Sequence, residues 1–232
     1  MERYYLGGYY LIRLTPIVYF GETEARVLHT SSSCFNQYLF DYWCLSNREP
    51  DEQIIFNLGL SNEKIQVIKK WAVDKYKLGM LQWGKSFSDL ETAETFKNLF
   101  FPDLPDTYSY SIYLSDTDTD SLLTHFSDGN VNKGDFSLYH NLTKKTPEKI
   151  SPAEEFIGYD FIGVESGGSF HSFYCHGIGN ELAEKFSLQF NQYGLFEAIN
   201  QPEPIRKYLN DPGTAVEPVP WYIAKTKRVV TF

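Results

Sequence analysis

The chain has 232 residues and a formal net charge of −9 at pH 7. This length is enough to bury a sizeable core without metals or disulfides. The acidic balance argues against nucleic acid or an anionic membrane surface as the main partner, because both need clustered Lys and Arg. The chain contains no run of about eighteen uninterrupted apolar residues and does not begin like a signal peptide, so we expect a cytoplasmic protein without a membrane span.

The first twenty residues read as sheet. Strand-like runs cover residues 3–6, 9–14 and 17–20, and Gly7-Gly8 separates the first two. A Gly-Gly pair between tyrosines is typical of a two-residue hairpin, but it also fits a bulge inside one long strand. Residues 35–44 place apolar side chains at helical spacing, although their aromatic content favours a strand.

Two helices have clear end signals. One runs over residues 62–78, with Ser61 as N-cap and Gly79 just beyond its end. The next runs over residues 89–98, where Ser88 and Glu91 have the spacing of a capping box. Both carry an apolar stripe for a buried face.

The second half alternates strands and helices without a regular period. We expect strands over residues 108–114, 157–164 and 221–230, and helices over 120–126, 180–186 and 205–208. A loop rich in Lys, Thr and Pro covers residues 144–152. The irregular order predicts a single α+β domain over residues 1–232, with a mixed, mainly antiparallel sheet and several packed helices. Aromatic residues make up 17% of the chain, which favours such a sheet.

One short sequence occurs twice. Phe35-Asn36-Gln37-Tyr38 recurs at residues 190–193, but the flanking sequences do not align. We interpret the match as chance, and the alternative is a diverged internal repeat.

Residues with ligand or nucleophile chemistry gather between positions 166 and 176. His171, Cys175 and His176 are of the types that bind zinc, but a strand there would place His171 and Cys175 about 13 Å apart, too far for one ion. The sequence therefore predicts no metal site and no cofactor. Together with Cys34 and Cys44, Cys175 is expected to be a reduced, mostly buried thiol, because the cysteine spacing fits no zinc ribbon or redox pair.

The same segment contains the candidates for nucleophilic catalysis. Ser166 and Ser169 flank the Gly167-Gly168 pair close to His171, and Cys175 adjoins His176. Neither serine has glycines two residues away on both sides, as a nucleophile elbow requires. Ser169, His171, Cys175 and His176 are thus weak catalytic candidates, and scaffold is the favoured interpretation.

Carboxylates elsewhere have simpler roles. Asp116, Asp118 and Asp120 begin like a calcium loop, but the closing glutamate is missing, so they are expected to cap a helix and supply its first-turn charges. Asp160 lies within an apolar strand and needs a partner, for which Arg13, Arg206 or Arg228 are candidates.

The tyrosine surplus has two interpretations. The 17 tyrosines are too many to be all internal, and exposed tyrosines anchor protein interfaces well. The other interpretation is a β-rich core with hydroxyls at its rim. Tyr9, Tyr110, Tyr159 and Asp160 are our candidate binding residues.

A resemblance rests on about forty residues of the second half. It is carried by Gly158-Tyr159-Asp160, the Cys175 region and the ending Leu188-x-x-Asn191-x-Tyr193-Gly194-Leu195-Phe196. This pattern resembles uncharacterised bacterial proteins, some of them suspected immunity proteins of polymorphic toxin systems. The resemblance implies a protein that blocks a toxin, and it assigns no functional residue.

Charge, tyrosine content and this resemblance together predict a protein-binding function. The expected partner is a basic protein toxin, because an acidic surface speeds encounter with it. The alternative is a hydrolase with its site between Ser166 and His176, and that alternative requires a histidine and a carboxylate to converge in a pocket.

Overall fold

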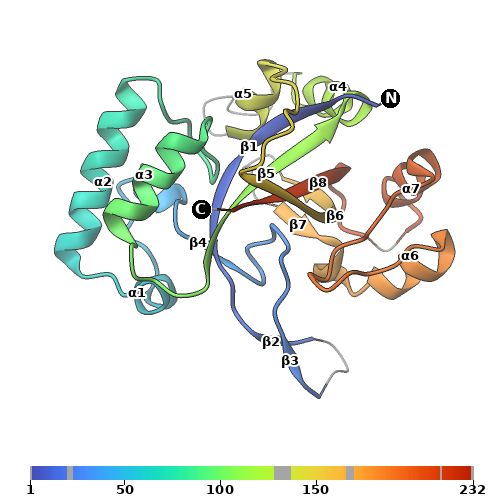
Figure 1. Ribbon diagram of the computed structural model, residues 1–232, viewed down its shortest axis with the longest axis horizontal. Helices are drawn as coiled ribbons and strands as arrows, with labels where there is room; N and C mark the ends of the chain where they lie inside the picture. Colours follow the sequence, from blue (N-terminus) through green and yellow to red (C-terminus); the bar gives the residue numbers. More distant parts are fainter. Residues whose placement is uncertain (1, 20–22, 128–136, 166–169, 215, 231–232) are drawn as a thin grey trace.

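The sheet is the centre of the structure. The computed structural model describes residues 2–19, 23–127, 137–165, 170–214 and 216–230. Within them, six antiparallel strands lie in the order β4-β1-β5-β8-β6-β7, and helices pack around them, which confirms the α+β prediction (Figure 1). The strands are β1 (Tyr4–Arg13), β4 (Gln37–Tyr38), β5 (Thr107–Ser115), β6 (Glu154–Val164), β7 (Phe170–Ser172) and β8 (Trp221–Val229), while β2 (Ile17–Val18) and β3 (Ala25–Arg26) form a separate pair.

The helices fall into three groups. Near one end of the sheet, at the left of Figure 1, lie α1 (Glu52–Leu58), α2 (Asn62–Lys77) and α3 (Leu90–Phe100), and near the other end, at the right, lie α6 (Gly179–Phe186) and α7 (Pro202–Leu209). The third group, α4 (Asp116–His125) and α5 (Ser137–Thr143), connects β5 to β6 in sequence. Two short 3₁₀ turns, η1 (Tyr42–Cys44) and η3 (Phe173–His176), follow β4 and β7.

The sheet contains the same strand ladder twice. Tyr4 to Arg13 of β1 pair with Ser115 to Thr107 of β5, and Glu154 to Gly163 of β6 pair with Val229 to Trp221 of β8 in the same register. Each ladder has one bulge, and each bulge precedes a glycine with positive φ, Gly8 (φ +134°) and Gly158 (φ +137°). We call residues 4–115 the N-terminal unit and residues 154–229 the C-terminal unit.

The rest of each unit follows the same plan. In both, an edge strand (β4 or β7) leads into a 3₁₀ turn and then a helix (α2 or α6), and the N-terminal unit has α1 as an additional helix between them. A turn then follows that pairs with the first strand of its own unit. The backbone of Phe87 is hydrogen-bonded to that of Tyr9 in β1, and the backbone of Phe196 is hydrogen-bonded to that of Tyr159 in β6. A second helix (α3 or α7) leads back to the central strand. The two units therefore form an internal structural repeat.

A pseudo-twofold axis relates the two units. β5 and β8 pair from Tyr110–Arg228 to Leu114–Ala224, and Ile112 faces Thr226 at the midpoint. These two residues occupy equivalent positions, because each pairs with the glycine that follows a bulge. The axis passes between them, so one continuous sheet joins both units.

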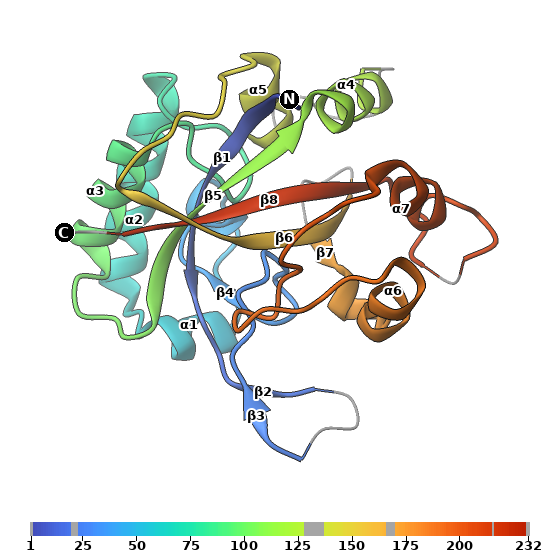
Figure 2. The ribbon, with the colours of Figure 1, turned by 45° about the vertical axis from the view of Figure 1, so that its right-hand side comes forward.

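Side chains at equivalent positions of the two units point to the same face of the sheet. Leu11 of β1 packs against α2 and α3, and its counterpart Phe161 packs against α6 and α7. The opposite face packs its own cluster with α4 and α5, including Ile12 and its counterpart Ile162. The middle of the first face, between the two helix groups, is crossed by the linker from α5 to β6 (Figure 2).

Several local predictions need correction. Gly7-Gly8 lies in a bulge inside one strand, so the hairpin alternative is wrong. Residues 35–44 form a two-residue strand and a 3₁₀ turn instead of a helix. The two FNQY segments are not equivalent, because the first enters edge strand β4 and the second lies in the closed turn after α6. The internal repeat is real, but this match does not carry it.

The predicted helix ends agree better with the structure. Ser61 caps α2 through its side chain, as predicted. Asp89, instead of Ser88, caps α3 by accepting from Thr92 N–H at 2.7 Å. Ser115 caps α4, which starts at Asp116, earlier than expected, and Asp116 and Asp118 supply its first-turn charges as predicted.

Candidate functional site

Histidine, cysteine and carboxylate groups meet at the edge of the C-terminal unit. Ligand atoms of Cys34, His171 and Cys175 all lie within 4.8 Å of one another, and so do those of His171, His176 and Glu217. We call these five residues the His171 cluster. The predicted separation of about 13 Å is wrong, because Cys175 lies in η3, which turns the chain back after the short strand β7.

A serine makes this turn. Ser172 caps η3, accepting from the Tyr174 N–H, and its own N–H donates to Cys175 Sγ at 3.3 Å. Gly177 ends the turn with φ +67°, a conformation that glycine adopts at no steric cost. The capped turn thus places Cys175 beside the loop that holds Cys34, where Ser32 Oγ lies 3.1 Å from Cys175 Sγ.

Asp160 of β6 connects the loop that holds Cys34 with Ser172 at the end of β7. Its carboxylate is fully buried and accepts from Thr30 Oγ1 at 2.7 Å, Ser172 Oγ at 2.8 Å and Ser31 N at 3.3 Å. Hydroxyl and amide donors therefore replace the arginine partner that the sequence predicted. Burial raises the pKa of Asp160 to about 6. Asp160 thus tethers the loop of Cys34 to the strand of His171.

Cys175 in the His171 cluster is a poor nucleophile on its own. Burial raises the pKa of Cys175 to about 12, so the thiolate is scarce at neutral pH. His171 Nε2 lies 2.9 Å from Glu165 Oε1, and His176 Nε2 lies 3.3 Å from Glu217 Oε2. Ser166 and Ser169, the serine candidates, lie outside the described residues.

The candidate binding tyrosines are not at one site. Tyr110 is buried, and its hydroxyl lies 2.8 Å from His29 Nδ1 on the face of α4 and α5. Tyr9 and Tyr159 are half-buried on the opposite face, each at the bridge that closes its unit. The structure therefore brings neither Tyr110 nor Asp160 together with Tyr9.

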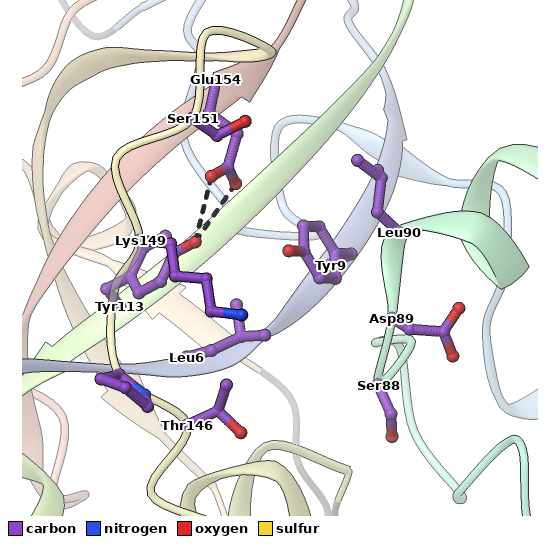
Figure 3. Close-up of a pocket in the computed structure, with 11 residues that line it drawn as sticks. Leu6, Tyr9, Ser88, Asp89, Leu90, Tyr113, Thr146, Lys149, Ser151 and Glu154 are labelled. Atoms are coloured by element: carbon purple, nitrogen blue, oxygen red, sulfur yellow. Dashed lines mark hydrogen bonds between the residues drawn. The ribbon is translucent and has the colours of Figure 1, made fainter.

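A cleft of about 330 Å³ opens beside Tyr9, on the sheet face between the helix groups (Figure 3). Its floor comes from β1 and β5 through Leu6, Tyr9 and Tyr113. The start of α3 supplies one wall through Ser88, Asp89 and Leu90, and the linker supplies the other through Thr146, Pro147, Lys149 and Ser151, with Glu154 at the start of β6.

Hydrogen bonds fix the polar floor of the cleft. Glu154 accepts from Ser111 Oγ at 2.5 Å and from Tyr113 Oη at 3.2 Å. Burial raises the pKa values of Tyr9 and Tyr113, so both phenols stay protonated and can only donate or accept hydrogen bonds. The cleft therefore offers hydrogen-bonding groups, and its phenols cannot serve as bases at neutral pH.

The two units differ at their outer edges. On β1, the linker pairs with the edge: Leu6 N donates to Thr146 O at 2.9 Å, and Glu148 N donates to Tyr4 O at 2.8 Å. The equivalent groups of β6 are Phe156 N and Glu154 O. Among the described residues, no strand or loop pairs with them along that edge, and Phe156 is 42% exposed.

Some residues of the His171 cluster and of the cleft could be predicted from the sequence, and others could not. The ligand types of His171, Cys175 and His176 were visible, but Cys34 and Glu217 lie far away in sequence and carry no local signature. Glu154 was also missed, because it precedes the predicted strand. Ser172, which caps η3, is the local signal that could have indicated the turn that brings Cys175 back to His171.

Comparisons with known proteins do not narrow these possibilities. Among the described residues, no helix is both long and apolar enough to cross a membrane. Neither models of protein families, nor curated proteins, nor solved structures yield a match to this chain.

Proposed function

We propose that this chain is a cytoplasmic protein-binding protein that neutralises a basic toxin by stoichiometric binding, as an immunity protein of bacteria does. The observation that carries the proposal is the open edge of β6 at residues 154–156, whose equivalent on β1 is covered by the linker. An unpaired edge is a template for a strand of another chain.

The neighbourhood of this edge suits a protein partner. Phe156 and Ile150 are exposed apolar side chains within six residues of each other in the sequence. Aromatic side chains of this kind are frequent anchors at interfaces. The occupant we favour is an extended strand of a basic protein, since the net charge of −9 would attract it and speed encounter.

The hydrolase alternative has less support. Its histidines do contact carboxylates, at His171–Glu165 and His176–Glu217. The thiol of Cys175, however, stays protonated at neutral pH. Burial also lowers the pKa of His176, so that residue supplies no imidazolium to stabilise a thiolate.

The test uses the product of the neighbouring gene, purified in an inactive form. We expect a 1:1 complex by calorimetry, an association rate that falls with salt, and protection of the Phe156 amide in hydrogen exchange. Phe156→Ala should weaken binding at least about tenfold, which corresponds to about 1.4 kcal/mol. Phe56→Ala is the matched control, because Phe56 is an 82% exposed phenylalanine on α1.

Two outcomes would contradict the proposal. One is a complex that protects other amides and leaves residues 154–157 exchanging freely. The other is equal binding by the Phe156→Ala and Phe56→Ala variants. Failure of the neighbouring protein to bind at all would reject it as the toxin.

A further inference from the structure

We propose that the His171 cluster is a zinc site, in which Cys34, His171 and Cys175 hold the ion and the fourth position faces His176 and Glu217. The proposal is independent of the protein-binding function, because it concerns the loop edge of the C-terminal unit rather than the start of β6. It also departs from the sequence-based expectation of no metal.

The geometry is close to that of a bound ion. Tetrahedral zinc, with Zn–S near 2.3 Å and Zn–N near 2.0–2.1 Å, separates its ligand atoms by about 3.5 to 3.8 Å. The ligand atoms of Cys34, His171 and Cys175 already lie within 4.8 Å of one another. Small side-chain rotations would close the remaining gap, and Cys34 is exposed and so free to make one.

The surroundings of His171 are those of a metal ligand. A ligating imidazole donates its second N–H to a carboxylate or carbonyl in nearly all metal sites, and this contact fixes the ring. His171 Nε2 lies 2.9 Å from Glu165 Oε1, which leaves Nδ1 for the ion. Nδ1 lies 3.6 Å from Glu217 Oε2, on the side where the fourth position is proposed.

An unsatisfied atom marks the fourth position. His176 Nε2 is buried and has no hydrogen-bond partner, although Glu217 Oε2 lies 3.3 Å away at an unfavourable angle. Buried polar nitrogens are rarely left unpaired, and a bound ion or water is one of the usual partners of such an atom. A zinc ion or its bound water on this side would satisfy the ring nitrogen.

The scaffold holds the ligands from three separate segments. Cys34 lies in the loop after β3, His171 and Cys175 lie in β7 and η3, and Glu217 lies in the loop before β8. Asp160 and Ser32 already connect the first two segments through hydrogen bonds. Zinc would add a crosslink among them, and so would stabilise the folded state relative to the unfolded chain.

Binding would proceed with loss of two thiol protons. Zinc takes the two sulfurs as thiolates and the imidazole as a neutral ligand, so two protons leave to solvent for each ion bound. The two thiolates balance the charge of the ion. Soft thiolate and imidazole ligands select zinc over magnesium or calcium, which prefer oxygen.

The first experiment measures metal content of the protein purified under reducing conditions. We expect one zinc per chain, removed by a strong chelator with a fall in Tm and restored by added zinc but not magnesium. Cobalt in place of zinc should show a thiolate-to-metal charge-transfer band in the near ultraviolet. This band reports cysteine ligation without any substitution.

Variants then assign the ligands. Cys175→Ser and Cys34→Ser should each abolish stoichiometric zinc and the cobalt band, and Glu165→Gln should weaken zinc affinity about tenfold. Cys44→Ala is the matched control and should keep both, because Cys44 occupies η1, the turn equivalent to η3, and is buried away from the cluster.

The proposal is overturned by any of three results. These are zinc well below one per chain with no tight uptake on titration, equal zinc retention by the Cys44 and Cys175 variants, and a disulfide between Cys34 and Cys175 in the freshly purified protein. The last result would assign the thiol pair to redox chemistry.

Discussion

At the centre of β1 the N-terminal unit carries Tyr10, and at the equivalent position of β6 the C-terminal unit carries Asp160. Tyr10 packs edge-to-face against Tyr38 and Phe170, at ring distances of 5.9 and 5.5 Å. Asp160 instead collects hydrogen bonds from Thr30, Ser31 and Ser172. The backbone ladder is the same, so the ladder does not dictate which kind of interaction fills this position.

The same contrast holds for the two 3₁₀ turns. Cys44 in η1 is buried among apolar side chains of α2 and α3, whereas Cys175 in η3 meets histidine and a second thiol. Residues with ligand chemistry therefore gather at the edge of the C-terminal unit, where the loop of Cys34 from the N-terminal unit meets His171 and Cys175. The comparison separates the backbone pairing that both units share from the polar side chains that the C-terminal unit adds.

The largest expected effect tests the shared bulge. Gly8→Ala and Gly158→Ala should each lower the free energy of unfolding by about 4 kcal/mol, since φ near +135° is strained for alanine and its Cβ would lie within 2.8 Å of neighbouring atoms. Chemical denaturation measures both. A loss under about 1 kcal/mol in either unit would show that its bulge can be rebuilt, and so would weaken the equivalence.

The second effect is a pH dependence of stability that Asp160 should cause and its counterpart Tyr10 should not. Burial raises the pKa of Asp160 from 3.8 to about 6, so the folded state binds a proton more tightly than the unfolded chain does. The contribution of Asp160 to stability should therefore fall as pH rises from about 4 to 6, by about 3 kcal/mol in total.

Urea denaturation of wild type and Asp160→Asn across this range measures it. The difference between the two proteins should change with pH below 6 and level off above. A constant difference would mean that the donors around Asp160 hold its pKa near the ordinary value.

A third effect compares the amides that support the bulges. Asn141 Nδ2 donates to Gly7 O at 3.0 Å, and Asn191 Nδ2 donates to Ile157 O at 2.7 Å, the carbonyls at equivalent positions. Asn141→Ala and Asn191→Ala should each cost about 2 kcal/mol, because each leaves that carbonyl without its side-chain donor. Unfolding midpoints with unchanged m-values would check it. An effect in only one unit would restrict the role of the amide to that unit.

The smallest effect is expected at Phe156, in a comparison of the two outer edges. Leu6 is buried under the linker, so Leu6→Ala should cost about 2 kcal/mol or more. Its counterpart Phe156 is exposed, and Phe156→Ala should change stability by no more than about 0.5 kcal/mol. Thermal unfolding of both variants measures the contrast. Similar losses would mean that the β6 edge is packed in the free protein.

Sequence patterns predicted the elements whose causes are local. The cap at Ser61 and the apolar stripe of α2 are set by neighbours along the chain, and so were readable. The alternation of β5 was readable for the same reason. These elements fix the fold class but not the internal repeat.

The internal repeat was hidden because main-chain pairing defines it. Gly8-Tyr9 and Gly158-Tyr159 are the residues that the two ladders share around the bulge, and most other equivalent pairs differ. The conspicuous FNQY match pointed to non-equivalent places. The His171 cluster was hidden for another reason, since Cys34 and Glu217 reach it only through tertiary contacts.

The pairing of β5 with β8 has a consequence for dissection of the molecule. A fragment that ends after α5 would leave the β5 strand with its inner edge bare, and Ile112 would lie where the axis had been. Two such fragments would restore the lost pairing if their β5 strands paired antiparallel with each other about a twofold axis at Ile112. The fragment should therefore behave as a symmetric homodimer, which sedimentation would reveal, and the intact chain would be a covalently linked version of that assembly.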